Sequence, residues 1–342
     1  MGRAAITLAA NNGAIGGGEV MLLALAEVLR ELGREVAVVG PSAPGGVLDA
    51  AGDRGFDVVE LPTARPDYVR ALRRWDRRER RGVLWCNGLV PAVATTGRSH
   101  RIVHLHADIA PAHRLLARAA RRGALATLVP SRNLANRVPG AIPMPNWTVD
   151  LGAVRPGLPN TPAVLGFLGR PSVLKGTVVL AEACARLADT GHAVRLLIAG
   201  ESRFIEPAEQ VRVQQSLSAV GDLVSQVGWV DPREFFSTID VAVFPSIVAE
   251  SFGLAAAEAM SARTPVIVSD AGALPEVVGP GHPWIARSSD PAHLAEVIRA
   301  TLGAPAPERA AVVDAARIRW EQHYSPAAGR RRVARIIDAL DV

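Results

Sequence analysis

The chain has 342 residues, of which 49% are hydrophobic, and this is enough for two globular domains with separate cores. Its two cysteines, Cys86 and Cys184, lie far apart and outside any CxxC pattern, which argues against a disulfide framework or a zinc site and favours a reducing cytoplasm. The net charge of +5 is uneven, because residues 1–150 hold 20 arginines against 13 acidic residues, whereas residues 151–342 hold 18 basic against 20 acidic residues.

Neither a leader peptide nor a membrane span is expected. The first ten residues contain a short apolar run without a following cleavage site, and we interpret them as a strand. The most apolar long stretch, residues 241–260, carries Glu250 and Glu258, whose charges would be costly inside a bilayer.

Short apolar or β-branched runs recur along the first half, each followed by a glycine-rich turn or a helix-like segment. This alternation predicts a parallel sheet with crossover helices. The predicted strands are 4–8, 35–39, 58–61, 83–85 and 101–104.

The pattern begins again in the second half, and we predict a second Rossmann-like unit there. Between the halves, residues 139–162 contain six prolines, which suit an inter-domain connection with a boundary near Val154. Ligands bind beyond the carboxyl ends of such sheets, so two facing units are expected to form a cleft. The predicted elements are strands 164–168, 194–199, 241–244 and 265–268, helix 177–188 and a final helix 326–340.

A glycine turn, Gly16-Gly17-Gly18-Glu19, lies between the first strand and a predicted helix over 20–32. Glycines let backbone amides approach an anion, and the start of a helix favours negative charge. A nicotinamide cofactor would use the same feature, but the full GxGxxG pattern is absent. A tight turn without a ligand is the alternative interpretation.

Two arginine-rich segments concentrate the positive charge of the first half, residues 70–81 and 114–122. Both are predicted to be helical and include apolar residues such as Leu72, Trp75, Leu115 and Leu116, so each could lie on an anionic membrane surface. A solvated arginine-rich face is the alternative, and nucleic acid is disfavoured because no aromatic residues interleave. The candidate acceptor or membrane residues are Arg73, Arg74, Arg77, Arg78 and Arg81.

The loop Gly169 to Gly176 follows a predicted strand and contains Arg170 and Lys175. Lys175 is the single lysine among 38 basic residues, which sets it apart from general surface charge. A planar guanidinium and a compact ammonium together suit the two phosphates of a nucleoside diphosphate.

The segment from Glu250 to Glu258 joins a predicted strand to a small-residue helix. With Glu250 in the loop and Glu258 on the helix, both carboxylates can face one ligand. One would bind sugar hydroxyls and the other a ribose diol, while free amides around Phe252 and Gly253 suit a phosphate or sugar oxygen.

Two histidines, His104 and His106, end a predicted strand of the first half. Strand alternation puts both on one side, so they could share a metal ion, but no third ligand has a fitting spacing. No metal site is therefore predicted.

Taken in order, these motifs and the segment 269–278 resemble family 4 of the retaining glycosyltransferases over nearly the whole chain, most specifically from Gly166 to Val278. Two segments depart from the family pattern. The motif Pro145 to Asp150 (Pro-Asn-Trp-Thr-Val-Asp) has Trp147-Thr148 where the family commonly reads Asn-Gly-Val-Asp, and Ala271-Gly272-Ala273 stands where a Gly-Gly pair is usual. The resemblance implies an α/β protein of GT-B fold, with two Rossmann-like domains facing each other across a cleft. The implied domains are an acceptor-binding domain over 1–153, a nucleotide-sugar-binding domain over 154–325 and a helix over 326–342 that crosses back.

The resemblance also implies residue roles. Arg170 and Lys175 would neutralise the leaving diphosphate, Glu250 would contact the transferred sugar and His106 would lie beside it; these four are the expected catalytic residues. Glu258 would hold the ribose. The remaining expected donor-binding residues are Gly16, Gly17, Gly169, Val230, Ser251, Phe252, Gly253 and Leu254.

The expected function is transfer of a hexosyl unit from a nucleoside-diphosphate sugar to an acceptor hydroxyl, with retention of configuration and without a metal ion or cofactor. The nucleotide of the donor would be UDP, GDP or ADP. The acceptor would be a glycan, a glycolipid or a small metabolite, and the location cytoplasmic, with peripheral membrane contact suggested by the basic first half. The alternatives are a nucleotide-sugar epimerase or sugar phosphorylase on the same scaffold, a nicotinamide-dependent oxidoreductase and a catalytically inactive sugar-binding or membrane-bound partner.

Overall fold

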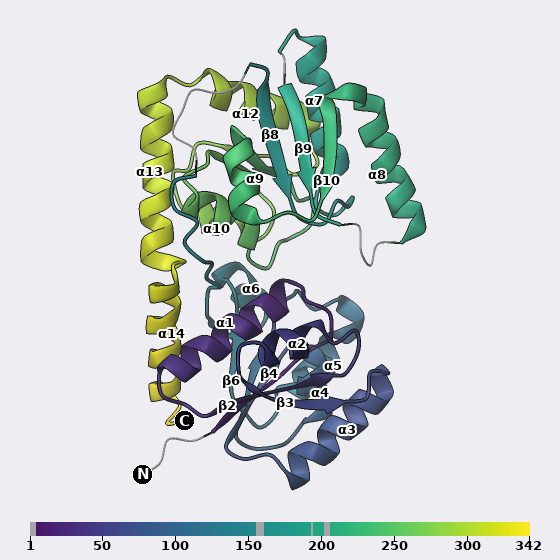
Figure 1. The fold of residues 1–342 in the computed structure, drawn as a ribbon, viewed down its shortest axis with the longest axis vertical. Coiled ribbons are helices and arrows are strands. Elements are labelled where there is room, and N and C mark those ends of the chain that lie inside the picture. The colour runs from purple at the N-terminus through teal and green to yellow at the C-terminus, as the bar shows by residue number, and fades with distance from the viewer. Residues whose placement is uncertain (1–4, 155–160, 193, 202–205) are drawn as a thin grey trace. The chain divides into compact units, whose positions relative to one another are not determined.

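The computed structural model of the protein describes residues 5–154, 161–192, 194–201 and 206–342. Two compact units make up the chain (Figure 1). Unit 1 consists of residues 1–146 and 329–342, and unit 2 of residues 147–328. Each unit is built on one parallel sheet, as the sequence predicts.

Unit 1 has a sheet in the order β3-β2-β1-β4-β5-β6-β7, in which the chain starts near the middle and turns back between β1 and β4. Its strands are β1 (Ile6–Ala9), β2 (Val36–Pro41), β3 (Asp57–Leu61), β4 (Val83–Asn87), β5 (Arg101–His104), β6 (Ala124–Val129) and β7 (Ile142–Pro143). Its helices are α1 (Gly17–Glu31), α2 (Gly46–Gly52), α3 (Arg65–Arg78), α4 (Leu89–Ala94), η1 (Pro111–His113), α5 (Arg114–Ala120), α6 (Arg132–Arg137) and most of α14 (Pro326–Ala339).

Unit 2 repeats this topology, with the order β10-β9-β8-β11-β12-β13 and the same reversal between its first and fourth strands. Its strands are β8 (Ala163–Leu168), β9 (Val194–Ala199), β10 (Val224–Gly228), β11 (Val241–Phe244), β12 (Val266–Ser269) and β13 (Ile285–Ala286). Its helices are α7 (Thr177–Asp189), α8 (Pro207–Val220), η2 (Gly221–Leu223), α9 (Pro232–Thr238), α10 (Leu254–Ser261), α11 (Leu274–Val278), α12 (Pro291–Gly303) and α13 (Ala306–His323).

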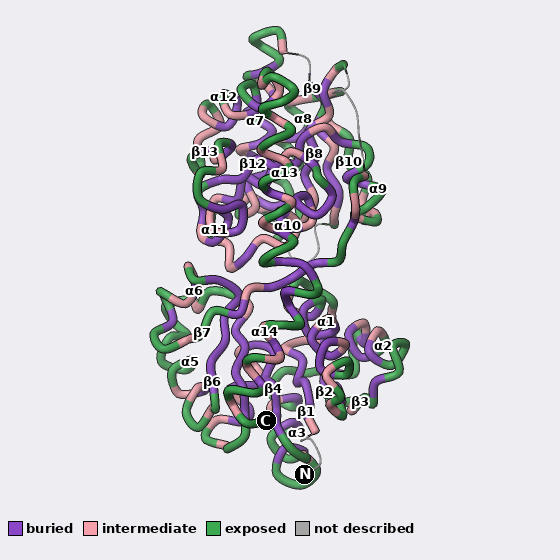
Figure 2. Tube along the Cα trace, turned by 90° about the vertical axis from the view of Figure 1, so that its left-hand side faces the viewer, coloured by how far each residue is buried: buried purple, intermediate pink, exposed green. Residues whose placement is uncertain are grey.

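The central strands read as continuous apolar runs because helices cover both faces of each sheet. Every residue of β4, β11 and β12 is buried, and exposed residues collect on the outer faces of helices and in loops (Figure 2). The strands that the sequence analysis does not predict, among them β10, are edge or near-edge strands. Because β10 is mostly exposed, its sequence Val-Ser-Gln-Val-Gly lacks the apolar run that marks a buried strand.

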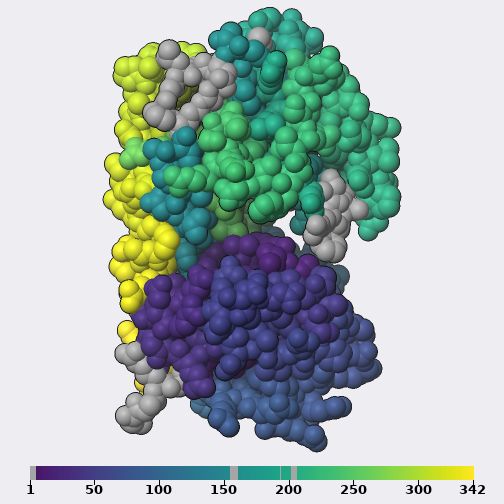
Figure 3. Space-filling view, viewed as in Figure 1, coloured from purple at the N-terminus to yellow at the C-terminus, as the bar shows by residue number. Residues whose placement is uncertain are grey.

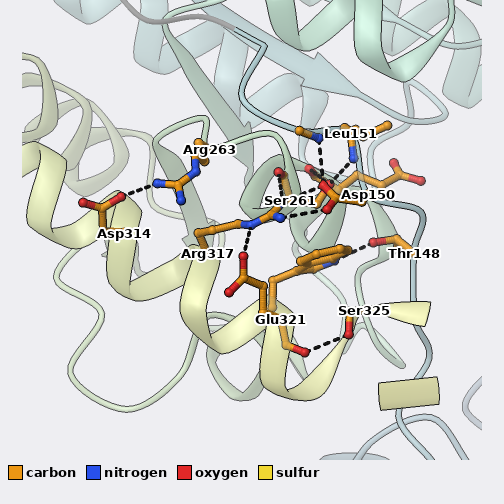
Figure 4. Close-up of polar contacts among 12 residues, drawn as sticks. Thr148, Asp150, Leu151, Ser261, Arg263, Asp314, Arg317, Glu321 and Ser325 are labelled. Carbon is orange, nitrogen blue, oxygen red and sulfur yellow. Dashed lines mark hydrogen bonds and ion pairs between the residues drawn. The ribbon is translucent and has the colours of Figure 1, made fainter. Parts of the chain in front are cut away.

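The segment that enters unit 2 is fixed to helix α13 by side-chain contacts (Figure 4). Arg317 donates from both terminal nitrogens to the carboxylate of Asp150, at 2.6 and 2.8 Å, and the indole of Trp320 donates to Thr148 Oγ1 at 2.8 Å. The Arg317 guanidinium holds the pKa of Asp150 below its usual value. This part of the Pro145 to Asp150 motif therefore acts as a structural anchor within unit 2.

Candidate functional site

The candidate donor site of unit 2 lies where its sheet reverses direction. At such a point, the connections after two adjacent strands leave toward opposite faces of the sheet and open a crevice beyond the carboxyl ends. Here the two strands are β8 and β11, which pair directly. The loop that follows β8 carries Arg170 and Lys175, and the loop that follows β11 carries Glu250.

Backbone packing holds the loop after β8 against the strand next to it. Gly176 has a φ of 77°, and a Cβ atom at this position would lie 1.9 Å from the carbonyl oxygen of Pro245. The loop is also hydrogen-bonded within itself, because the amide of Lys175 donates to Ser172 Oγ at 3.1 Å. The glycine that precedes α7 is therefore required for Lys175 to reach the β11 loop.

Lys175 and Glu250 form an ion pair across the reversal point. The Nζ of Lys175 lies 2.6 Å from Glu250 Oε1, which also accepts a hydrogen bond from Ser246 Oγ at 2.5 Å. Ser269 at the end of β12 donates to the carbonyl of Ser246 at 2.6 Å. The lysine side chain is 38% exposed and the glutamate side chain 13% exposed. An incoming anion can therefore reach the ammonium, while the hydrogen bond from Ser246 keeps the Glu250 carboxylate in place.

The loop after β12 supports Glu250 from the other side. Gly272 pairs with Glu250 as a parallel bridge, and Ala273 donates its amide to the Glu250 carbonyl at 2.9 Å. A Cβ on Gly272 would lie 2.3 Å from the Glu250 nitrogen. Within the segment Ala271-Gly272-Ala273, a glycine is therefore required at position 272, because the two backbones come too close there for a side chain.

Glu258 lies on α10, as the sequence predicts, while Glu250 lies in the loop before the helix. Burial, together with the nearby charge of Asp231, raises the pKa of Glu258 to about 7. The side chain of Phe252 is buried against Tyr324, with ring centroids 5.3 Å apart, so only its backbone is left for a ligand. Gly253, the residue before α10, has a φ of 107°.

The remaining predicted site residues of unit 2 follow the carboxyl ends of its strands, in loops except for Leu254, the first residue of α10. Arg170 is exposed directly after Gly169, whose φ is 148°. Val230 follows β10 and packs partly buried against the core, next to Trp229, which is 75% exposed. The other two predicted positions, Ser251 and Leu254, are half-buried.

Unit 1 places His106 at its own reversal point, between β1 and β4. Asn87, the last residue of β4, donates from Nδ2 to the Gly18 carbonyl at 2.9 Å, so its Oδ1 faces His106 Nε2 at 2.7 Å. An amide oxygen only accepts, so His106 must carry its proton on Nε2. Burial lowers the pKa of His106 to about 4, and the ring is therefore neutral near pH 7.

His104 packs directly on this ring. Its centroid lies 3.9 Å from that of His106, which confirms that both side chains lie on one side of the strand. The His104 ring is buried, and burial lowers its pKa well below the usual value. Among the described residues, no cluster of three or more His, Cys, Asp or Glu side chains is arranged to hold a metal ion.

The glycine turn of unit 1 differs from its prediction. Helix α1 begins at Gly17, three residues earlier than expected, which puts Glu19 in its first turn. The buried carboxylate of Glu19 accepts hydrogen bonds from the amides of Gly16 and Asn12, although burial on balance raises its pKa. The Gly16 amide, which the sequence analysis expects to bind an anion of the donor, therefore already donates to the Glu19 carboxylate.

The structure corrects the interpretation of the first arginine-rich segment. Leu72 is 0% and Trp75 8% exposed, because both pack into the core of unit 1. The apolar side of α3 therefore faces the protein. Five arginines on or just after this helix are exposed to solvent, namely Arg73, Arg74, Arg77, Arg78 and Arg81.

Sequence reasoning missed Asn87 and Ser246, which make the hydrogen bonds that orient His106 and Glu250. Asn87 is the last residue of a buried strand at the reversal point, and that position was the available signal. Ser246 follows β11 closely and had no distinguishing pattern. None of the helices that the structure describes has both the length and the hydropathy needed to cross a bilayer.

Comparison with known proteins bears on both the family and the fold. Residues 162–303 match the family model of glycosyl transferases group 1. The D-inositol 3-phosphate glycosyltransferase 2 of Catenulispora acidiphila is 33% identical over 188 residues, which are 49% of this chain and 44% of the relative. The D-inositol 3-phosphate glycosyltransferase of Mycobacterium leprae is 31% identical over 209 residues, which are 54% of this chain and 47% of the relative. The chain thus matches less than half the length of these relatives.

Solved structures extend the likeness to nearly the whole chain. The structure of Anabaena HepE in complex with UDP and glucose superposes with a TM-score of 0.84 at 18% identity, covering 98% of this chain and all of the other. Sucrose-phosphate synthase from Thermosynechococcus elongatus gives a TM-score of 0.79 at 20% identity, covering 99% of each chain. At such identities the likeness shows the fold, and the predicted GT-B class is confirmed.

Proposed function

We propose that the chain, whose residues 162–303 match the family model of glycosyl transferases group 1, transfers a hexosyl unit from a nucleoside-diphosphate sugar to an acceptor hydroxyl. The observation that carries this proposal is the Lys175–Glu250 pair at the reversal point of the unit 2 sheet. It offers an accessible cation for a diphosphate beside a fixed carboxylate for sugar hydroxyls.

The proposed donor contacts follow from the chemistry of these residues. Lys175 leaves Glu250 for the diphosphate, Arg170 adds a second cation, and Ser246 keeps the carboxylate in place for the sugar. Glu258 accepts hydrogen bonds from the ribose hydroxyls, because a buried, deprotonated carboxylate gains the most stabilisation from such donors. HepE forms complexes with UDP and with UDP-glucose, which makes UDP the first nucleotide to test.

We infer a retaining reaction that needs no divalent cation. The diphosphate departs on the face from which the acceptor hydroxyl attacks, and the proton of that hydroxyl passes to the leaving phosphate oxygen. The transition state gains stability from charges already in place, here Arg170 and Lys175, which offset the growing charge on the diphosphate. The neutral ring of His106 is assigned to the hydroxyls of the transferred sugar.

The acceptor is a glycan, a glycolipid or a small metabolite. Two features support an anionic one: the excess of arginine in residues 1–150, and the relatives named for D-inositol 3-phosphate. Inositol 3-phosphate is therefore an appropriate member of an acceptor panel.

The test is a transfer assay that follows both UDP release and the anomeric configuration of the product by NMR. We expect UDP-glucose to release UDP only with an acceptor, to give a product that keeps the donor configuration and to react equally with a chelator present. An inverted product would contradict retention. Conversion of the donor sugar without an acceptor would instead identify an epimerase and overturn the proposed transfer.

A further inference from the structure

Charge in unit 1 is separated along the sequence and along the sheet. Residues 1–64 hold 4 arginines and 8 acidic residues, whereas residues 65–149 hold 16 arginines and 4 acidic residues. Between Asp108 and Asp150 the chain has six arginines and no Asp or Glu. This acid-free segment builds α5, β6, α6 and β7, which lie together at one edge of the unit 1 sheet (Figure 2).

The two arginine-rich helices of unit 1 present different surfaces. Helix α3, in blue in Figure 3, buries its apolar residues and shows mainly arginines to solvent. Helix α5 shows arginines and large apolar side chains together, because Leu115 is 82% and Leu116 46% exposed. We define the α5 surface as Arg114, Leu115, Leu116, Arg118 and Arg122, which are all exposed.

Helix geometry places Leu115 at the outermost point of this surface. Successive residues turn by about 100° around a helix, so Leu115 lies opposite the buried residues Ala117 and Ala120. Arg114 and Arg118 lie one turn apart on one side of Leu115, and Leu116 lies on the other side. Among the described residues, no ion pair joins Arg114, Arg118 or Arg122 to a carboxylate, whereas Arg137 of the same segment pairs with Asp108.

We propose that the α5 surface docks unit 1 on an anionic lipid bilayer, with Leu115 and Leu116 among the acyl chains and the three arginines on lipid phosphates. Exposed leucines next to exposed arginines on one helix have the pattern of an interfacial anchor. A nucleic-acid site would need aromatic side chains for the bases, and residues 86–146 contain no Phe, Trp or Tyr. The surface does not depend on the proposed function, because docking needs no nucleotide.

The test is sedimentation of the full-length protein with phosphatidylcholine vesicles, with and without phosphatidylglycerol. We expect binding only to the anionic vesicles and release as the salt concentration rises. Leu115→Ser with Leu116→Ser should weaken binding about tenfold or more. Arg114→Gln with Arg118→Gln should weaken it about fivefold for each charge removed.

Matched controls separate this surface from general charge and general hydrophobicity. Arg73→Gln with Arg77→Gln removes two α3 arginines at the same spacing, and Ile318→Ser removes an exposed apolar side chain of unit 2. Both controls should retain most of the binding. Equal loss in the α3 control, an unchanged affinity of the leucine variant, or binding to soluble polyglutamate but not to vesicles would overturn the proposal. Because all substituted side chains are exposed, circular dichroism should show unchanged folding.

Discussion

At the scale of single residues, the candidate site is marked by groups whose ionisation is set by burial. Glu258 has a pKa of about 7 and His106 a pKa of about 4, so a carboxyl and an imidazole both depart from their ordinary values. Burial is the first cause in each case, and no opposite charge compensates it. Such groups cost stability in the free protein, which is typical of ligand sites.

Glu258→Gln should stabilise the free protein at alkaline pH. The folded-state pKa lies above the ordinary value of 4.5, so the native state binds this proton more tightly than the unfolded state does. The contribution of Glu258 to stability is therefore full below pH 4.5 and falls as the pH rises through about 7. Glutamine avoids that fall, worth up to about 3 kcal/mol at pH 8.

Thermal melts of both proteins at pH 5 and pH 8 measure this difference. The variant should match the wild type at pH 5 and melt higher at pH 8, while binding UDP more weakly there. A melting difference that is independent of pH would contradict the assigned burial of a charged carboxylate.

Asn87→Asp should raise the pKa of His106. A carboxylate would then accept from Nε2 at the position where the amide oxygen lies 2.7 Å away, and an adjacent negative charge favours imidazolium. Because transfer is proposed to need the neutral ring, the transfer activity of Asn87→Asp should begin to decline at a higher pH than that of the wild type as the solution is made more acidic. Asn87→Ala is the control, since it removes the acceptor without adding charge.

NMR titration of the His106 ring and the pH profile of transfer should move together in the aspartate variant. A raised pKa with an unchanged activity profile would remove His106 from the proposed mechanism. An unchanged pKa would contradict the hydrogen bond itself.

At the scale of elements, the site depends on loops held close by glycines. Gly176 and Gly191 have the same φ of 77°, but a Cβ on Gly176 would meet the Pro245 carbonyl at 1.9 Å, whereas a Cβ on Gly191 has nothing within 4 Å. The pair therefore separates the cost of backbone conformation from the cost of a clash.

Gly191→Ala should lower the free energy of unfolding by about 1 kcal/mol, the penalty of a left-handed conformation. Gly176→Ala should cost about 1–3 kcal/mol more and weaken nucleotide binding, because it displaces the loop that carries Lys175. Urea unfolding of both variants measures the difference. Equal destabilisation would show that the Gly176 contact relaxes without consequence.

Elements whose sequence and environment agree could be predicted from the chain alone. The runs Arg101 to His104, Val194 to Ala199 and Val241 to Phe244 form strands with the predicted bounds, since each contains the consecutive apolar residues that are typical of a buried parallel strand. Edge strand β10 was missed because its residues are mostly exposed. The placement of Glu250 before a helix and of Glu258 on it was predicted from the loop, the glycine and the preceding strand.

Contacts between distant loops could not be predicted in this way. The Lys175–Glu250 ion pair joins residues 75 positions apart, and Asn87 contacts Gly18 from 69 positions away. Nothing in either local sequence specifies the partner. The exposure of Leu115 and the burial of Leu72 also depend on how each helix packs, which two similar arginine-rich sequences do not reveal.

At the scale of the whole molecule, each unit repeats one topology and places its notable polar groups at one reversal point. Unit 2 is closed by the Asp150–Arg317 and Thr148–Trp320 contacts, which tie its first residues to α13. Trp320 is 1% exposed and belongs to a core cluster of unit 2.

Trp320→Ala should therefore destabilise unit 2 by about 3–5 kcal/mol, because it leaves a large cavity and an unpaired Thr148 hydroxyl. Hydrogen exchange measures stability by region. Protection should fall in β8 and β11 and change little in β1 and β4. Uniform loss of protection across both sheets would show that the two units do not unfold separately.

The central claim is that the reversal point of unit 2 binds a nucleoside diphosphate through Lys175. Calorimetric titration of the wild type and of two variants with UDP, GDP, ADP and NAD tests this claim. Lys175→Gln removes the proposed phosphate ligand. Arg195→Gln is the matched control, because it removes one exposed positive charge near the opposite end of the sheet. We expect one diphosphate to bind the wild type and Arg195→Gln alike and to bind Lys175→Gln at least tenfold more weakly, by the ~1.5–3 kcal/mol of a charge-assisted hydrogen bond. Equal binding by all three proteins, or binding of NAD alone, would contradict the account.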